Sequence, residues 1–151
     1  MTWRVTVAAV VERDGRFLVV EERPPGSGEV VWNQPAGHVD PGEPILDALV
    51  RETLEETGLA LTPTALVGVY QLRARDDRDY FRVCFAGTVP DGADARPRDP
   101  VILACRWVTR GALAAGPVRS GLVVRCVDDF LAGARLPLSA VAPLLDERAG
   151  R

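Results

Sequence analysis

Residues 37–59 read GHVDPGEPILDALVRETLEETGL, and this stretch decides the fold of the chain. Pro44 suits the first position of a helix, and Gly58 suits the residue at which a helix ends. Between the two, apolar residues recur at helical spacing: Ile45, Leu46, Leu49 and Val50. The sequence therefore predicts a helix from Pro44 to Thr57.

The predicted helix carries a strip of three carboxylates beside its apolar face. Glu52, Glu55 and Glu56 stand at positions i, i+3 and i+4, where like charges repel by about a few tenths of a kcal/mol per pair. A positive group should compensate, and either Arg51 or a divalent cation could do so. A solvated acidic face explains the same pattern, and the cluster alone favours that interpretation.

The segment in front of the helix strengthens the case for a cation. Gly37 and Gly42 flank Asp40-Pro41 in a turn-rich loop that could present backbone groups beside the helix, and Glu43 lies at the helix entrance. Carboxylates and a backbone carbonyl form an all-oxygen donor set, which Mg²⁺ and Mn²⁺ prefer. The chemistry that this set implies is metal-assisted hydrolysis of a phosphate compound.

The spacing of these residues resembles the Nudix box, G-x5-E-x7-R-E-U-x-E-E-x-G-U, in which U is aliphatic. Gly37, Glu43 and residues 51–59 (RETLEETGL) meet every charged and glycine position. Thr53 departs from the pattern at the first aliphatic position. We expect its methyl group to pack in the buried face and its hydroxyl to bond a carbonyl of the helix.

The resemblance covers most of the chain and is closest to the NudJ-type phosphatases among the Nudix hydrolases. It includes WNQPAGH at residues 32–38, CRWV at 105–108 and Arg119-Ser120 before the last predicted helix. It implies an α/β/α sandwich with a mixed sheet between helices. The alternation of strand-like and helical patterns independently indicates an α+β or α/β sandwich.

The resemblance also implies roles for individual residues. Nudix hydrolases cleave a diphosphate linked to another moiety and use Mg²⁺ or Mn²⁺. The implied metal ligands are the Gly37 carbonyl, Glu52, Glu55 and Glu56. Glu43 and Gly58 would support the site, and Arg51 would orient the glutamates.

The general base varies within the superfamily. Glu52 is the first candidate. Asp99 is the second, because it is the acidic residue nearest to the loop before the last predicted strand. The alternative interpretation, a solvated loop residue without a catalytic role, explains Asp99 equally well.

Candidates for substrate binding come from the resemblance and from the arginines. The resemblance points to Arg23, after the second strand, and to Gln34. A second group of arginines surrounds three aspartates, so pairing within this group explains it at least as well as phosphate binding. The group comprises Arg73, Arg75, Arg78 and Arg82, with Asp76, Asp77 and Asp79.

The expected function is hydrolysis of nucleoside di- and triphosphates and related pyrophosphates, and the NudJ-type resemblance adds hydroxymethylpyrimidine diphosphate. One alternative is a MutT-like pyrophosphohydrolase of oxidised nucleotide triphosphates. Another is a nucleotide-binding Nudix domain without catalysis, against which the intact glutamates argue.

Composition excludes several other classes. All 18 basic residues are arginine, and His38 is the only histidine. This composition excludes enzymes with a catalytic lysine and metal sites built from several histidines. A net charge of −3 argues against nucleic-acid polymers as partners. The three cysteines are widely spaced and predict reduced thiols, and no segment resembles a signal peptide or membrane span. We expect a cytoplasmic monomer or homodimer that binds a small nucleotide or pyrophosphate.

Most of the chain should form one domain, residues 1–133, with residues 134–151 as a tail lying on its surface. Strand-like runs are expected at residues 5–11, 17–20, 30–32, 59–61, 65–72, 80–89 and 104–108. Asp14-Gly15 should turn the first hairpin, and residues 120–131 should form the last helix on the sheet.

Overall fold

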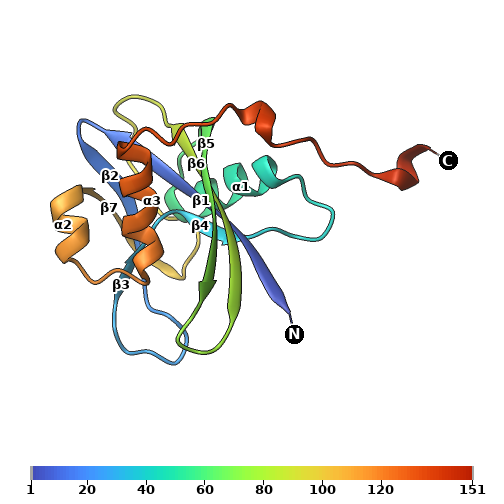
Figure 1. Cartoon of the computed structure of the whole chain (residues 1–151). Helices are drawn as coiled ribbons and strands as arrows, with labels where there is room; N and C mark the ends of the chain where they lie inside the picture. The colour runs from blue at the N-terminus through green and yellow to red at the C-terminus, as the bar shows by residue number, and fades with distance from the viewer. Residues whose placement is uncertain (1, 151) are drawn as a thin grey trace.

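The computed structural model describes residues 2–150 and shows a mixed sheet covered by helices on both faces (Figure 1). The strands are β1 (Trp3–Arg13), β2 (Arg16–Glu22), β3 (Val31–Asn33), β4 (Ala36–His38), β5 (Thr62–Arg73), β6 (Asp79–Thr88) and β7 (Ile102–Thr109). The helices are α1 (Ile45–Thr57), α2 (Arg110–Ala115) and α3 (Gly121–Leu131), followed by the short 3-10 turns η1 (Leu138–Ala140) and η2 (Glu147–Gly150).

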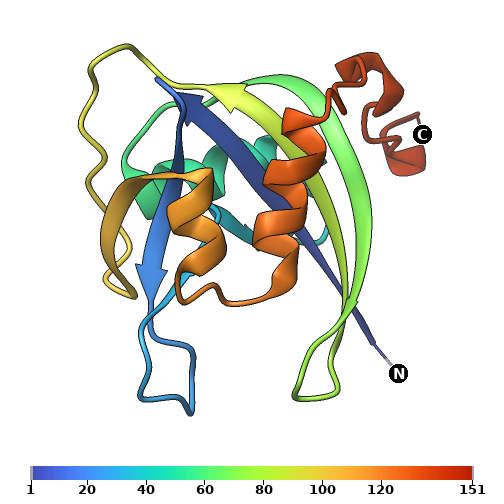
Figure 2. The same ribbon diagram turned by 60° about the vertical axis from the view of Figure 1, so that its left-hand side comes forward.

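The sheet is built around β1. Its main order is β3-β2-β1-β6-β5, while β4 pairs with β1 and β7 pairs with β2. Strands β1 and β6 run parallel, and the other pairs are antiparallel. Figure 2 shows α2 and α3 on one face of the sheet and α1 on the other. The predicted α/β/α sandwich with a mixed sheet is confirmed.

Two hydrophobic cores form because successive side chains of a strand point to opposite faces. Ala8 and Val10 of β1 pack on the α3 side, in the same cluster as Val123 of α3. Val7 packs on the α1 side, in the same cluster as Leu49. This alternation assigns each residue of β1 to either the α1 face or the α3 face.

The local predictions hold for the first hairpin and for α1. Asp14 and Gly15 both have positive φ, 52° and 75°, as a two-residue turn that suits a hairpin requires. Thr53 is fully buried, and its hydroxyl donates to the Leu49 carbonyl at 2.8 Å, as expected. Gly58 ends α1 with a φ of 71°.

One strand prediction was wrong, and one strand was missed. Residues 59–61 form no strand. Leu59 and Leu61 alternate like strand residues, but they lie in the segment between α1 and β5 and are buried in the α1-side core. Strand β4 was not predicted, because it has only three residues and follows Pro35 directly. Its pairing with Thr6, Val7 and Ala8 of β1 is a long-range contact that local patterns do not reveal.

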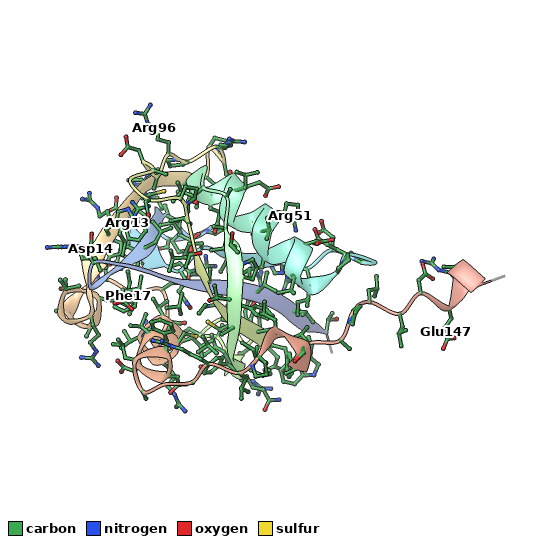
Figure 3. All side chains as sticks on the ribbon, turned by 90° about the horizontal axis from the view of Figure 1, so that it is seen from above. Arg13, Asp14, Phe17, Arg51, Arg96 and Glu147 are labelled. Carbon is green, nitrogen blue, oxygen red and sulfur yellow. The ribbon has the colours of Figure 1, made fainter. Side chains whose placement is uncertain are left out.

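The C-terminal segment begins in contact with the sheet and then leaves it. Leu66 of β5 and Leu136 exchange two backbone hydrogen bonds of 2.8 Å, and Leu138 and Val141 pack against the α1-side core. Glu147 lies well away from the body of the protein (Figure 3). Within residues 2–150, no helix is long and apolar enough to cross a membrane.

We expect the two parts of this segment to differ in their contribution to stability. Deletion of residues 134–151 removes the Leu138 and Val141 contacts and should cost about 1–3 kcal/mol, lowering the melting temperature by roughly 3–10 °C. Deletion of residues 143–151 is the matched control and should leave it unchanged. Equal melting temperatures for both truncations would show that the packed part contributes nothing.

Candidate functional site

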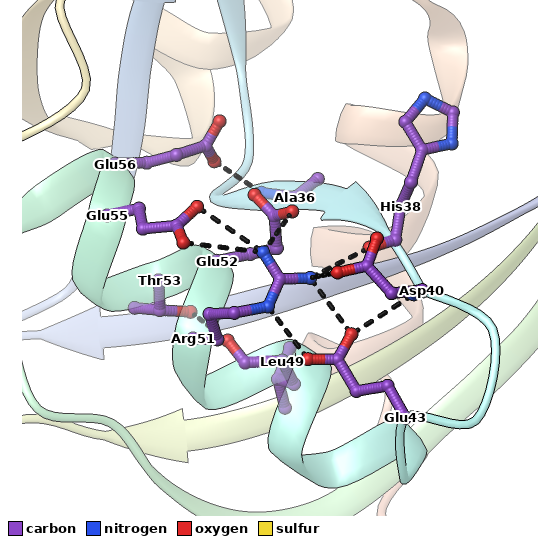
Figure 4. A network of polar contacts seen from close by, with 10 residues as sticks. All are labelled: Ala36, His38, Asp40, Glu43, Leu49, Arg51, Glu52, Thr53, Glu55 and Glu56. Carbon is purple, nitrogen blue, oxygen red and sulfur yellow. Dashed lines mark hydrogen bonds and ion pairs between the residues drawn. The ribbon is translucent and has the colours of Figure 1, made fainter.

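Arg51 lies at the centre of a network of carboxylates on the outer side of α1 (Figure 4). Its Nε and Nη2 donate to the two carboxylate oxygens of Glu43 at 2.7 and 2.9 Å. Its Nη1 donates to Glu52 at 2.9 Å and to Glu55 at 3.3 Å, and Nη2 also reaches the His38 carbonyl at 3.1 Å. The paired guanidinium lowers the pKa of Glu43 to about 2. Arg51 therefore links the helix to the segment before it.

Glu56 is buried at the end of this strip. Its side chain is 7% exposed, and Oε1 accepts a hydrogen bond of 2.7 Å from the Ala36 backbone N–H. Burial raises the pKa of Glu56 to about 9, and the nearby negative charges of Glu22, Glu52 and Asp99 act in the same direction. Without a cation beside it, this carboxyl is protonated at neutral pH.

Glu52 lies directly against the backbone of Gly37. A Cβ added at residue 37 would overlap the Glu52 carboxyl group, so a side chain here would displace that carboxyl from the backbone of β4. Burial is the largest influence on Glu52 and raises the pKa of its carboxyl, against the opposing effect of Arg51. Gly37 and Glu52, paired by the resemblance, are thus in contact.

Gly37→Ala should abolish or strongly reduce the hydrolysis that the sequence predicts, because the new methyl group would displace the Glu52 carboxyl. We expect kcat to fall by about 100-fold or more. Gly28→Ala is the control, since an added Cβ there meets nothing within 4 Å. Steady-state kinetics of the two variants check this; equal activity would contradict the assigned contact.

The residues fit a divalent cation in their chemistry. The donors are all oxygens, and burial disfavours the charged forms of Glu56 and Glu52, which a cation would stabilise. Among residues 2–150, however, no three acidic, histidine or cysteine side chains converge in ligand geometry. The reason is visible in Figure 4: Arg51 bonds Glu52 and Glu55, while Glu56 turns to Ala36. A cation would therefore compete with Arg51 for these carboxylates.

The raised pKa of Glu56 gives the metal-free protein a pH-dependent stability. The Glu56 carboxyl keeps its proton up to about pH 9 in the folded protein, whereas the ordinary pKa of a glutamate side chain is 4.5. The stabilisation from this bound proton is fully present below pH 4.5 and is lost as the pH rises through about 9. In chelator, the free energy of unfolding should therefore fall between these pH values, and Glu56→Gln should flatten that slope.

Denaturant unfolding at a series of pH values measures this effect. The exposed Glu12→Gln variant serves as the control and should keep the wild-type slope. A Glu56→Gln slope that matches the wild type would show that another group is responsible.

The loop between β6 and β7 fixes the other end of α1. The Thr57 carbonyl accepts the Arg96 N–H at 2.7 Å, and the Glu55 carbonyl accepts the Asp99 N–H at 2.8 Å. Gly58 is required here as well, because a Cβ would clash with the Arg96 carbonyl. Asp99 is thereby brought near Glu56, although its own carboxylate accepts from the Val101 N–H at 2.9 Å.

A cleft of about 830 Å³ opens on the α3 face of the sheet, beside the carboxylate strip. Its lining includes Ala36 and Gly37 of β4, the residues that contact Glu56 and Glu52. The helix α1 and the cleft therefore meet at β4, with the carboxylates on one side and room for a ligand on the other.

Glu22 belongs to this site and was missed by sequence reasoning. It is 8% exposed, lines the cleft, and accepts hydrogen bonds from Arg119 at 2.5 Å and Asn33 at 3.2 Å. Its charge contributes to the raised pKa of Glu56. The only local signal is that Glu21-Glu22 ends the second strand, and nothing in that pattern pairs it with Arg119.

The two substrate-binding candidates occupy different environments. Arg23 is exposed and is not among the residues that line the cleft, although its neighbours Glu22 and Pro24 are. Gln34 is only 2% exposed; its amide nitrogen donates to the Ala9 carbonyl at 3.2 Å and its oxygen accepts from Arg82 at 3.3 Å. Gln34 thus contacts Arg82 from within the core, and Arg82 lines the cleft.

Comparisons with known proteins identify relatives of this chain. A family model described as NUDIX domain matches residues 2–124. Phosphatase NudJ of Escherichia coli K12 is 38% identical over 138 residues, covering 91% of this chain and 89% of that protein. The structure of a NUDIX hydrolase from Nitrosomonas europaea superposes with a TM-score of 0.87 at 39% identity, covering 93% of this chain and 97% of the other. A MutT NUDIX hydrolase structure from Burkholderia pseudomallei gives 0.73 at 26% identity, with coverages of 85% and 98%.

Proposed function

This chain belongs to the NUDIX domain family of hydrolases, and we propose that it hydrolyses nucleoside di- and triphosphates and related pyrophosphates with Mg²⁺ as cofactor. The observation that carries the proposal is the contact between β4 and α1. It partly buries Glu52 and buries Glu56 at the edge of a cleft that is large enough for a nucleotide-sized ligand.

The metal would be held by the Gly37 carbonyl, Glu52, Glu55 and Glu56. When bound, Mg²⁺ would supply positive charge that neutralises the phosphate oxygens around the phosphorus under attack. Mn²⁺ offers similar chemistry and is the alternative cofactor. The hydrogen bonds between Arg51 and Glu43 attach the loop before α1 to the helix. Gly58 leaves room for the β6–β7 loop to pack against the end of the helix.

Glu52 is the first candidate for the general base. Its burial against Gly37 raises its pKa toward the working pH, which suits a group that accepts a proton. Asp99 remains the second candidate, because the β6–β7 loop brings it near Glu56. The Val101 N–H already engages its carboxylate, which favours Glu52.

The likeness to phosphatase NudJ supports a NudJ-like range of substrates, and hydroxymethylpyrimidine diphosphate belongs in any test panel. The MutT neighbour supports the alternative of an oxidised nucleotide triphosphate. The third alternative, nucleotide binding without turnover, predicts a ligand but no product. A cytoplasmic location and a monomeric or homodimeric state remain part of the proposal.

A pyrophosphate substrate screen with Mg²⁺, scored for phosphate against diphosphate release, tests the function. Glu52→Gln should lower kcat by about 10²- to 10⁴-fold, the range for loss of a general base. Asp47→Asn, an exposed carboxylate on the same helix, should retain wild-type activity. Unchanged hydrolysis by Glu52→Gln in saturating Mg²⁺ would refute the assigned site.

A further inference from the structure

Two neighbouring side chains on the floor of the cleft carry buried polar atoms without partners. Thr6 of β1 and Arg82 of β6 are direct partners in the parallel pair, and both line the cleft. Within residues 2–150, Thr6 Oγ1 and Arg82 Nε are the buried side-chain nitrogen and oxygen atoms that lack a hydrogen-bond partner. Both unpartnered atoms therefore occur at one place in the sheet.

Such atoms are costly in a folded protein. Buried polar groups are almost always hydrogen-bonded, and an unsatisfied one costs about 1–3 kcal/mol. Thr6 is only 5% exposed, so solvent offers its hydroxyl little compensation. Two unsatisfied groups at adjacent positions indicate that a ligand, rather than the protein, supplies the missing hydrogen-bond partners.

Arg82 differs from the other arginines around the cleft. Arg73 pairs with Asp79 at 2.8 Å and Arg119 pairs with Glu22 at 2.5 Å. In the described part of the chain, Arg82 forms no ion pair; its side chain donates to the Gln34 oxygen at 3.3 Å. Burial lowers the pKa of Arg82, because loss of water disfavours the charged guanidinium.

Gln34 holds the guanidinium in place. Its amide nitrogen is fixed by the Ala9 carbonyl, which leaves its oxygen directed toward Arg82. The orientation of Arg82 is thus set by a buried residue before any ligand binds, and such preorganisation reduces the entropic cost of binding.

The position of the pair relates it to the carboxylate strip. Thr6 is paired on its other side with His38 of β4, next to Gly37. Adjacent strands lie about 4.8 Å apart, so the backbone of Arg82 is roughly 10 Å from β4. A substrate that reaches from the carboxylates into the cleft passes over Thr6 and then Arg82.

We propose that Thr6 and Arg82 form a specificity-determining subsite that binds an anionic phosphate oxygen of the substrate. A hydroxyl and a guanidinium both donate hydrogen bonds, so the ligand atom is an acceptor, and the uncompensated cation favours an anion. This inference rests on the proposed function and adds which residues hold the phosphate chain.

Arg82→Met and Thr6→Val test the subsite while keeping side-chain volume similar. With the nucleotide substrate that the screen identifies, KM should rise about 10- to 100-fold for Arg82→Met and about 3- to 10-fold for Thr6→Val, from the loss of hydrogen bonds to a charged group. In both variants kcat should change by less than about threefold. Arg73→Met, in the same cleft but paired with Asp79, is the control and should keep the wild-type KM.

Thermal unfolding of Thr6→Val separates a ligand-binding role from a structural one. If Oγ1 has no partner in the free protein, its removal should keep or raise the melting temperature while KM still rises. A lower melting temperature with unchanged KM would show that the hydroxyl is structural and would overturn the assignment.

Binding of inorganic pyrophosphate without Mg²⁺, measured by calorimetry in the Glu52→Gln background, distinguishes this inference from the proposed function. Loss of binding on adding Arg82→Met supports the subsite even if the screen finds no turnover. Hydrolysis by the wild type with unchanged KM and unchanged pyrophosphate binding in Arg82→Met would overturn the subsite and leave the proposed function intact.

Discussion

The contact between β4 and α1 is the constraint on which the rest of the site depends. Gly37 allows the strand to touch the Glu52 carboxyl, and the Ala36 N–H holds Glu56 in a buried position. Both carboxyls lose hydration there, and their pKa values rise as a result. The contact with a strand of three residues thereby disfavours the charged forms of two carboxyls on an acidic helix face.

The surrounding elements keep this contact in place. Arg51 joins Glu43 before the helix to Glu52 and Glu55 on it, and the β6–β7 loop bonds the last carbonyls of α1. The same guanidinium also balances the charges that a divalent cation would need. Arg51 therefore stabilises the metal-free helix, and a cation must displace it from Glu52 and Glu55 in order to bind them.

The arginines show how far local sequence could predict the site. For the group at residues 73–82, pairing with its own aspartates explained the pattern at least as well as phosphate binding. Arg73 and Arg78 do pair with Asp79 and Asp76. Arg82 does not, because its place in β6 turns it toward the sheet face that forms the cleft. Gln34 was expected to meet substrate, yet the fold buries it and leaves it as the support of Arg82.

The sequence by itself determined the helix with its three glutamates, the glycines at both ends, and the buried role of Thr53. These features depend on residue spacing along one element, and helical geometry converts spacing into a face. The tertiary structure alone decided that Glu22 joins Glu56, that Arg23 stays outside the cleft and that Thr6 lies beside Arg82. Those neighbours come from strands far apart in the chain, and the register that aligns them is set by long-range pairing through β1.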